Sequence, residues 1–106
     1  MQAVTRTQVI WSAEALVDLE VIYDFLSEKS QPAAQRVIEG LLSRTKQLEN
    51  FPESGALHES MKNTHKQYRY LVEGNYKMIY SYQSGNNVVY IEVIFDTRHN
   101  PDKLKV

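Results

Sequence analysis

The sequence predicts an α+β domain in which an antiparallel helix hairpin packs on one face of a mostly antiparallel four-stranded sheet. Three observations lead to this prediction. Two stretches in the first half repeat apolar residues every three or four positions, as amphipathic helices do. Three stretches in the second half are rich in β-branched and aromatic residues, and connectors typical of hairpins separate them. The element order is therefore β-α-α-β-β-β, within one domain over residues 1–106.

The first half begins with a predicted strand over residues 4–11, VTRTQVIW. Ser12 follows as a helix N-cap, and Glu14 lies in the first turn, where the helix dipole favours a negative charge. This helix is predicted to end near Lys29. Its apolar stripe is Leu16, Leu19, Ile22, Tyr23 and Leu26. Carboxylates on the other side, such as Asp18 and Glu28, are expected to face solvent.

The second helix is predicted to begin at Ser30, because a serine cap with Pro32 in the first turn is a strong start signal. Gly40 lies in mid-helix at a cost of about 1 kcal/mol relative to alanine, so it indicates close helix packing. The segment FPESG, residues 51–55, ends the helix. The apolar stripe is Ala34, Val37, Ile38, Leu41, Leu42 and Leu48.

The second half is predicted to form an antiparallel meander after a loop over residues 56–67. The strands are expected at residues 68–72, 76–82 and 88–95, joined by Gly74-Asn75 and by the segment 84–87. A two-residue turn at Gly74-Asn75 would place Arg69 opposite Tyr80 and Leu71 opposite Met78. In the last strand the apolar alternate set is predicted to face the helices, with Asp96 and Arg98 following on the more open face. That apolar set is Val89, Ile91, Val93 and Phe95.

Composition narrows the possible functions. Residues 1–56 carry five Lys/Arg and eight Asp/Glu (5 − 8 = −3), and residues 57–106 carry seven and five (7 − 5 = +2), so the chain is not a strongly basic nucleic-acid binder. The absence of cysteine excludes thiolate chemistry and fits a reducing compartment. There is no signal-peptide pattern or membrane-spanning apolar run, so we expect a cytoplasmic protein. No metal-ligand or cofactor motif is recognisable, and we expect no cofactor.

One group of residues could do chemistry. Arg69, Lys77, Arg98 and His99, with Lys62, His65 and Lys66 from the preceding loop, could hold a phosphodiester and exchange protons without a metal. The alternative is that Arg98 pairs locally with Asp96 and that His99 shapes the turn before Pro101. Six of the seven tyrosines lie in the meander, where strand propensity explains them as well as a base-stacking surface would.

The order of these elements, together with FPESG, YRYLVEGNYKMIYSY and the terminal VIFDTRHNPDKL, resembles the RelE/ParE toxin superfamily from Trp11 to Leu104. The resemblance implies the toxin of a type II toxin-antitoxin, or plasmid-stabilisation, module that inhibits growth. It also implies a cognate antitoxin that silences the toxin. We expect the antitoxin-binding surface to include apolar residues of the helix hairpin and the open face of the sheet.

Two mechanisms divide the superfamily. RelE-like members cut messenger RNA on the ribosome by metal-free attack of the 2′-hydroxyl, and ParE-like members are associated with DNA gyrase inhibition. By resemblance, Arg69, Lys77 and Arg98 match basic positions of the RelE-like enzymes, and His99 stands near their late acid/base position. The weak net charge and the DTRHNP ending favour the ParE-like branch, so the chain need not be an enzyme. An inert homologue that acts only as a binding module is a further possibility.

Overall fold

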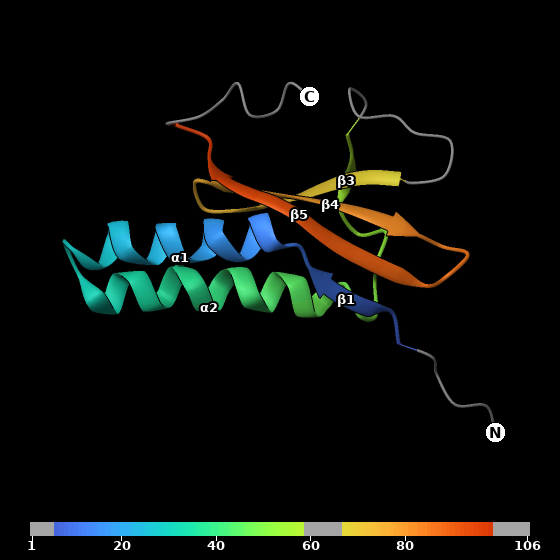
Figure 1. Ribbon diagram of the computed structural model, residues 1–106, viewed down its shortest axis with the longest axis horizontal. Coiled ribbons are helices and arrows are strands. Elements are labelled where there is room, and N and C mark those ends of the chain that lie inside the picture. The colour runs from blue at the N-terminus through green and yellow to red at the C-terminus, as the bar shows by residue number, and fades with distance from the viewer. Residues whose placement is uncertain (1–5, 59–66, 99–106) are drawn as a thin grey trace.

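Two helices form one layer and a five-stranded sheet forms the other, as the computed structural model in Figure 1 shows. The structure describes residues 6–58 and 67–98. The elements are β1 (Gln8–Trp11), α1 (Ala13–Ser27), α2 (Gln31–Gln47), β2 (Ala56–Leu57), β3 (Gln67–Glu73), β4 (Tyr76–Gln83) and β5 (Val88–Asp96). The α+β class and the antiparallel helix hairpin on one sheet face are therefore confirmed.

Both helices begin where the sequence predicts. The Ser12 hydroxyl accepts a hydrogen bond from the amide of Ala15 at 3.0 Å, and the Ser30 hydroxyl accepts one from Ala33 at 3.2 Å. Each serine satisfies one of the amides that the first turn of a helix leaves without an intrahelical partner. The short connection between the helices turns the chain back, and α2 lies alongside α1.

The sheet has the strand order β1-β5-β4-β3-β2, with β1 parallel to β5 and the other neighbours antiparallel. It has one strand more than the four predicted, because β2 lies in the segment that the sequence assigns to a loop. A two-residue strand is too short to show an alternation of polar and apolar residues. The first strand covers residues 8–11 of the predicted 4–11, and residues 1–5 lie outside the described part of the chain.

The β3–β4 hairpin has the predicted register. A two-residue turn joins Glu73 to Tyr76, and Arg69 lies opposite Tyr80. Gly74 has φ +59°, a left-handed backbone conformation that a residue with a Cβ adopts at a cost. The second connector reverses the chain with Asn87 at φ 56°, as the Gly/Asn composition predicts.

A β-bulge in β5 changes which side chains face the helices. Ile79 of β4 pairs with Val93, but the next residue, Tyr80, pairs with Ile91, so Glu92 is an extra residue in the ladder. Beyond the bulge the alternation is reversed, and Ile94 is the residue that packs in the core. The prediction that Val93 and Phe95 face the helices is therefore wrong, because one inserted residue exchanges the two faces of a strand.

Side chains of α1 satisfy the backbone at this bulge. The Ser12 hydroxyl donates to the carbonyl of Glu92 at 2.8 Å, and the amide of Ile94 donates to the Asp18 carboxylate at 2.9 Å. Asp18 therefore contacts the sheet, and the prediction that it faces solvent is wrong. These two bonds join the first half of α1 to the middle of β5 and leave those backbone groups with partners.

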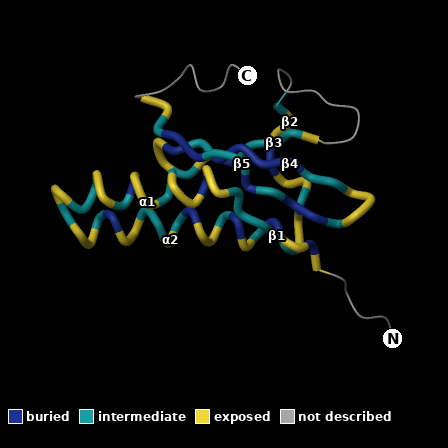
Figure 2. The backbone as a smooth tube through the Cα atoms, in the orientation of Figure 1, coloured by how far each residue is buried: buried dark blue, intermediate teal, exposed yellow. Residues whose placement is uncertain are grey.

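The hydrophobic core lies between the helix hairpin and the sheet, and Figure 2 shows buried positions concentrated on the central strands β4 and β5. Its fully buried members are Leu41, Leu48, Met78, Tyr80, Val89, Ile91 and Ile94, together with Ala15. Gly40 is closely approached, but by the sheet and not by the other helix as the sequence indicates, because a Cβ built there would lie 2.7 Å from the carboxylate of Glu73 in β3. None of the helices in the described residues is long and apolar enough to cross a membrane.

Candidate functional site

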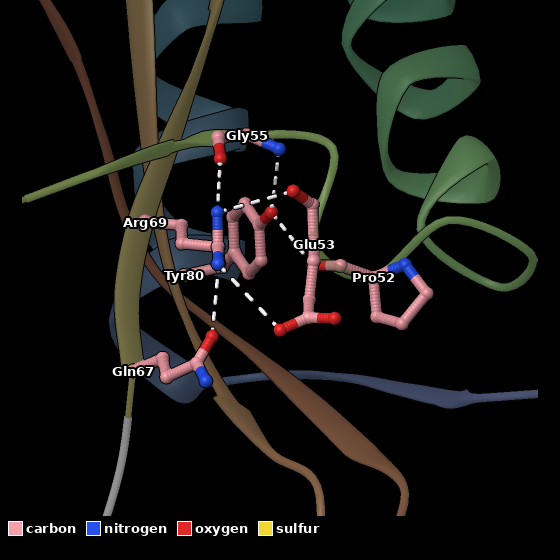
Figure 3. Close-up of polar contacts among 6 residues, drawn as sticks. All are labelled: Pro52, Glu53, Gly55, Gln67, Arg69 and Tyr80. Atoms are coloured by element: carbon pink, nitrogen blue, oxygen red, sulfur yellow. Dashed lines mark hydrogen bonds and ion pairs between the residues drawn. The ribbon is translucent and has the colours of Figure 1, made fainter.

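Among the predicted site residues that the structure describes, Arg69 has polar contacts with the largest number of other residues. It lies on the side of the sheet that faces the helices, since it pairs with the core residue Tyr80. One terminal nitrogen of its guanidinium donates to the carbonyls of Gly55 at 2.7 Å and Glu53 at 3.1 Å (Figure 3). The Nε atom donates to Gln67 at 3.1 Å, and the other terminal nitrogen lies 3.6 Å from the Glu53 carboxylate. With a side chain only 14% exposed, Arg69 fastens the segment after α2 to β3.

Tyr80, on the neighbouring strand β4, also binds the segment after α2. Its hydroxyl donates to the carbonyl of Pro52 at 2.8 Å and accepts from the amide of Gly55 at 3.0 Å (Figure 3). Burial raises the pKa of Tyr80 above its ordinary value, so the group stays protonated and can donate. Gly55 is required at this position, because an added Cβ would lie 2.6 Å from the backbone carbonyl of Tyr70. The FPESG motif is therefore a structural junction between α2 and the sheet.

Lys77 lies on the opposite side of the sheet. Its ammonium nitrogen is 3.8 Å from the centre of the Tyr70 ring, a cation–π contact. The His58 ring stands edge-on to the same tyrosine, with centroids 6.0 Å apart and planes at 80°. Tyr70 and His58 are not among the site residues predicted from the sequence. The register offered a signal for Tyr70, because it neighbours Arg69 in β3 and so must point to the side that Lys77 occupies.

Arg98 follows the last strand and is held by Asp96. Its Nε and one terminal nitrogen donate to the two carboxylate oxygens at 3.1 and 2.9 Å, and its backbone amide donates to the carboxylate at 2.8 Å. The hydrogen bond to Asp96 raises the pKa of Arg98 above its ordinary value. The Arg98 side chain is still 54% exposed, whereas that of Asp96 is 10% exposed.

Asp96 does not occupy the face that the sequence predicts. The bulge places it opposite Tyr76, which belongs to the core on the helix-facing side. Burial, and then the charge of Asp96, raise the pKa of Tyr76. The local pairing of Arg98 with Asp96, one of the two alternatives that the sequence leaves open, is therefore present. It also presents the outer part of the guanidinium beyond the end of β5.

The predicted cationic residues do not converge on one point among the described residues. Arg69 and Lys77 are on opposite sides of the sheet, and Arg98 is bound by Asp96 past the end of β5. The fourth candidate, His99, lies outside the described residues, as do Lys62, His65 and Lys66 of the preceding loop. The described geometry thus assigns Arg69 to support of the fold and leaves Lys77 and Arg98 as the more accessible charges.

Comparison with known proteins places this geometry in a family. The family model of the ParE toxin of type II toxin-antitoxin system, parDE, matches residues 9–101. The chain belongs to the ParE toxin family. It is therefore a toxin of the type II toxin-antitoxin class, within the wider RelE/ParE superfamily. Among curated proteins, no sequence matches the chain closely enough to be a relative.

Solved structures support the fold. The chain is similar to a protein of the chromosomal ParDE toxin-antitoxin system from P. aeruginosa, with a TM-score of 0.65 at 19% identity, over 85% of this chain and 95% of that one. It is also similar to the archaeal RelE-RelB complex from Pyrococcus horikoshii OT3, with a TM-score of 0.63 at 14% identity, over 91% and 99%. A third similar structure is the toxin-antitoxin complex RelBE2 from Mycobacterium tuberculosis, with a TM-score of 0.57 at 14% identity, over 91% of this chain and 97% of that one.

The meander tyrosines of this ParE-family chain divide between the two sides of the sheet. Tyr76, Tyr80 and Tyr82 belong to the core or pack against it. Tyr68, Tyr70 and Tyr90 point to the side of the sheet away from the helices. Their partners in the neighbouring strand, Ser81 and Ile79, alternate with the core residues of β4 and so face that side. Half of the cluster is therefore explained by packing, and the other half shares its side of the sheet with Lys77.

Proposed function

We propose that this ParE-family toxin inhibits growth by binding DNA gyrase, without catalysing a reaction, and that a cognate antitoxin silences it in the cytoplasm. The family supports the toxin class, and the titles of the similar structures describe toxin-antitoxin assemblies. The gyrase target is our inference from the ParE-like sequence pattern and from the distribution of charge on the sheet.

The separation of Arg69 from Lys77 is the observation that favours binding over catalysis. Metal-free cleavage of RNA needs cationic and acid/base groups that surround one phosphodiester and stabilise its transition-state charge. Arg69 has its guanidinium turned toward the helix side and engaged by the Glu53 and Gly55 carbonyls. Lys77 projects from the other face, over Tyr70. A single phosphate cannot contact both groups across the thickness of a sheet.

Arg98 is the residue that we expect to contact the target. The Asp96 carboxylate fixes the guanidinium in one orientation, so less side-chain entropy is lost when a partner binds. We expect Arg98→Ala to abolish growth inhibition and to leave the fold unchanged, since the side chain is half exposed and its hydrogen bonds within the described part of the chain are to its neighbour Asp96. Arg36→Ala, which removes an exposed cation from α2, is the matched control and should inhibit growth normally. Full growth inhibition by a well-expressed Arg98→Ala chain would refute this role.

The mechanism is tested by inducible expression in a bacterial host with pulse labelling of DNA and protein synthesis. An early stop in DNA synthesis, with a rise in the DNA-damage response, is the expected result. An early stop in protein synthesis, with new message ends on ribosomes, would overturn the gyrase proposal. It would instead support a RelE-like, ribosome-dependent mRNA endonuclease with His99 as its acid/base candidate. Unchanged growth with soluble protein present would leave only a binding module.

The antitoxin part of the proposal has its own test. We expect the chain to co-purify with the protein encoded by the neighbouring gene, and co-expression of that protein to restore growth. Growth inhibition that persists when both proteins are abundant and soluble would contradict the proposed pairing.

A further inference from the structure

The turn after β5 is fixed to the neighbouring hairpin. The end of β5 and the β3–β4 turn lie at the same end of the sheet, because Asp96 pairs with Tyr76 (Figure 1). The amide and the hydroxyl of Thr97 both donate to the carbonyl of Asn75, at 2.9 and 3.0 Å. Thr97 lies between Asp96 and Arg98 in the chain, so these bonds hold the backbone from which the Arg98 side chain projects.

The guanidinium of Arg98 is held on one edge and open on the other. A guanidinium has five N–H donors in a planar fork. The Asp96 carboxylate accepts two of them, one from Nε at 3.1 Å and one from a terminal nitrogen at 2.9 Å. The remaining donors are on the two terminal nitrogens and have no hydrogen-bond partner among the described residues. Two parallel N–H bonds can therefore form with one further planar acceptor.

The charge around this open edge favours a carboxylate over a nucleic-acid phosphate. Asp96 cancels the formal charge of Arg98, and the whole chain carries a net charge of −1. Binding to a nucleic-acid backbone usually needs several cations that neutralise several phosphates together. Arg69 is engaged on the helix side, and Lys77 is turned toward Tyr70 of β3, so neither forms such a patch with Arg98. An arginine edge of fixed geometry instead matches one carboxylate through two parallel bonds.

We propose that Asp96 is a positioning residue, which holds Arg98 so that its open edge binds an aspartate or glutamate carboxylate of the target protein. The inference rests on the proposed function and adds the chemistry of the group that Arg98 recognises. The Asp96 side chain is only 10% exposed, so it acts through Arg98, whose side chain is 54% exposed. Because the guanidinium is already ordered, less rotamer entropy is lost when the partner binds.

Asp96 can act on Arg98 in two ways, and the two have opposite signs. A carboxylate beside the guanidinium lowers the local positive potential, so its removal alone would strengthen attraction to an anionic partner. A carboxylate that orients the guanidinium favours binding, so its removal would weaken binding. Asp96 accepts bonds from both the backbone amide and the side chain of Arg98, which favours the second effect. The direction of the change in Asp96→Asn therefore decides between them.

The test measures the affinity of the full chain for purified DNA gyrase, together with the amount of folded chain that halves the growth rate of a bacterial host. Asp96→Asn keeps the shape of the side chain and should weaken binding by about 3- to 10-fold, the cost of ordering one arginine side chain. Arg98→Lys keeps the charge and should weaken binding by about 10-fold, because an ammonium group cannot form two parallel bonds to one carboxylate. In each variant, growth inhibition should fall together with the affinity.

Two comparisons separate positioning from general effects of charge and stability. Glu39→Gln removes one negative charge from the exposed surface of α2 and should change neither binding nor growth inhibition. In an Arg98→Ala background, Asp96→Asn should weaken binding by less than about 2-fold, because Asp96 acts through Arg98. Circular dichroism verifies that each variant is folded. Unchanged or tighter binding by Asp96→Asn would overturn the inference, and so would an undiminished effect of this substitution without Arg98.

Nitrogen-15 NMR of the Arg98 side chain tests the same geometry without the target. The Nε–H signal should exchange slowly with water in the unmodified chain, because Asp96 accepts this hydrogen bond, and it should be lost to fast exchange in Asp96→Asn. A glutamate-rich peptide should shift this signal, and Arg98→Lys should abolish the response. A shift caused by duplex DNA and not by the peptide would overturn the inference in favour of phosphate recognition.

These results distinguish failure of this inference from failure of the proposed function. If the unmodified chain binds gyrase and inhibits growth, yet Asp96→Asn is equally potent, the positioning role is wrong and the proposed function stands. If the unmodified chain neither binds gyrase nor inhibits growth, the proposed function fails. In that case the Arg98 signal and its response to the peptide still support or overturn the roles of Asp96 and of the open guanidinium edge.

Discussion

Replacing Arg69 by alanine tests whether this residue stabilises the fold or contacts a target. The substitution removes the donors to the Gly55 and Glu53 carbonyls and to Gln67, and it removes the ion pair with Glu53. A charged hydrogen bond to a part-buried carbonyl contributes about 1.5–2 kcal/mol, and an exposed one about 0.5 kcal/mol. The ion pair adds at most about 1 kcal/mol, because the Glu53 side chain is 57% exposed. The expected loss is therefore about 3 kcal/mol in the free energy of unfolding.

This loss is large for a chain of 106 residues. It corresponds to a fall in Tm of about 12–24 °C, at 4–8 °C for each kcal/mol. Urea unfolding followed by circular dichroism measures it, and growth assays at matched levels of folded protein measure toxicity. We expect Arg69→Ala to retain its toxicity per folded molecule, in contrast to Arg98→Ala. A destabilisation below about 1 kcal/mol, with toxicity lost, would refute the structural role.

The remaining predictions concern packing and pH. Gly55→Ala should reduce the free energy of unfolding by at least about 2 kcal/mol, because the added methyl meets rigid backbone, whereas Gly40→Ala should change it by less than about 1 kcal/mol, because it meets the flexible end of Glu73. Equal urea midpoints for the two variants would contradict this reasoning. Burial raises the pKa of Tyr80, so the unfolded chain ionises first, and stability that is complete below pH of about 10 should decline as pH rises toward the folded pKa. Tyr80→Phe should show a smaller decline between about pH 9 and pH 11 in the same assay, and an equal decline would exclude Tyr80 as a cause.

Local signals in the sequence determined the element order, apart from the short strand β2, and most boundaries. Ser12 and Ser30 supply the side-chain oxygens that begin the two helices, and the structure shows both as caps. The Gly74-Asn75 pair dictates a two-residue turn, and that turn alone sets the pairing of Arg69 with Tyr80. These features depend on residues close together in the chain, and for this reason they could be read without the tertiary structure.

The tertiary structure decided which side chains share a face. The segment VVYIEVIFD alternates without a visible break, yet it contains a bulge at Glu92 that exchanges the faces of everything after it. The Glu92 carbonyl accepts a hydrogen bond from Ser12, the N-cap of α1, and the Ile94 amide donates to Asp18 within α1. Residues 80 and 76 positions earlier in the chain therefore stabilise the irregularity. A pattern read along one strand cannot contain that information.

The candidate residues could be named from the sequence, but their arrangement could not. Arg69, Lys77 and Arg98 are identifiable by charge and position, and resemblance gave them a shared role. Where each points depends on long-range contacts, because the carbonyls of the segment after α2 attract Arg69 to the helix side while Lys77 turns to Tyr70. The sequence by itself determined the elements, the family resemblance and the available charges. Only packing of the hairpin on the sheet decided which charges support the fold and which stay exposed.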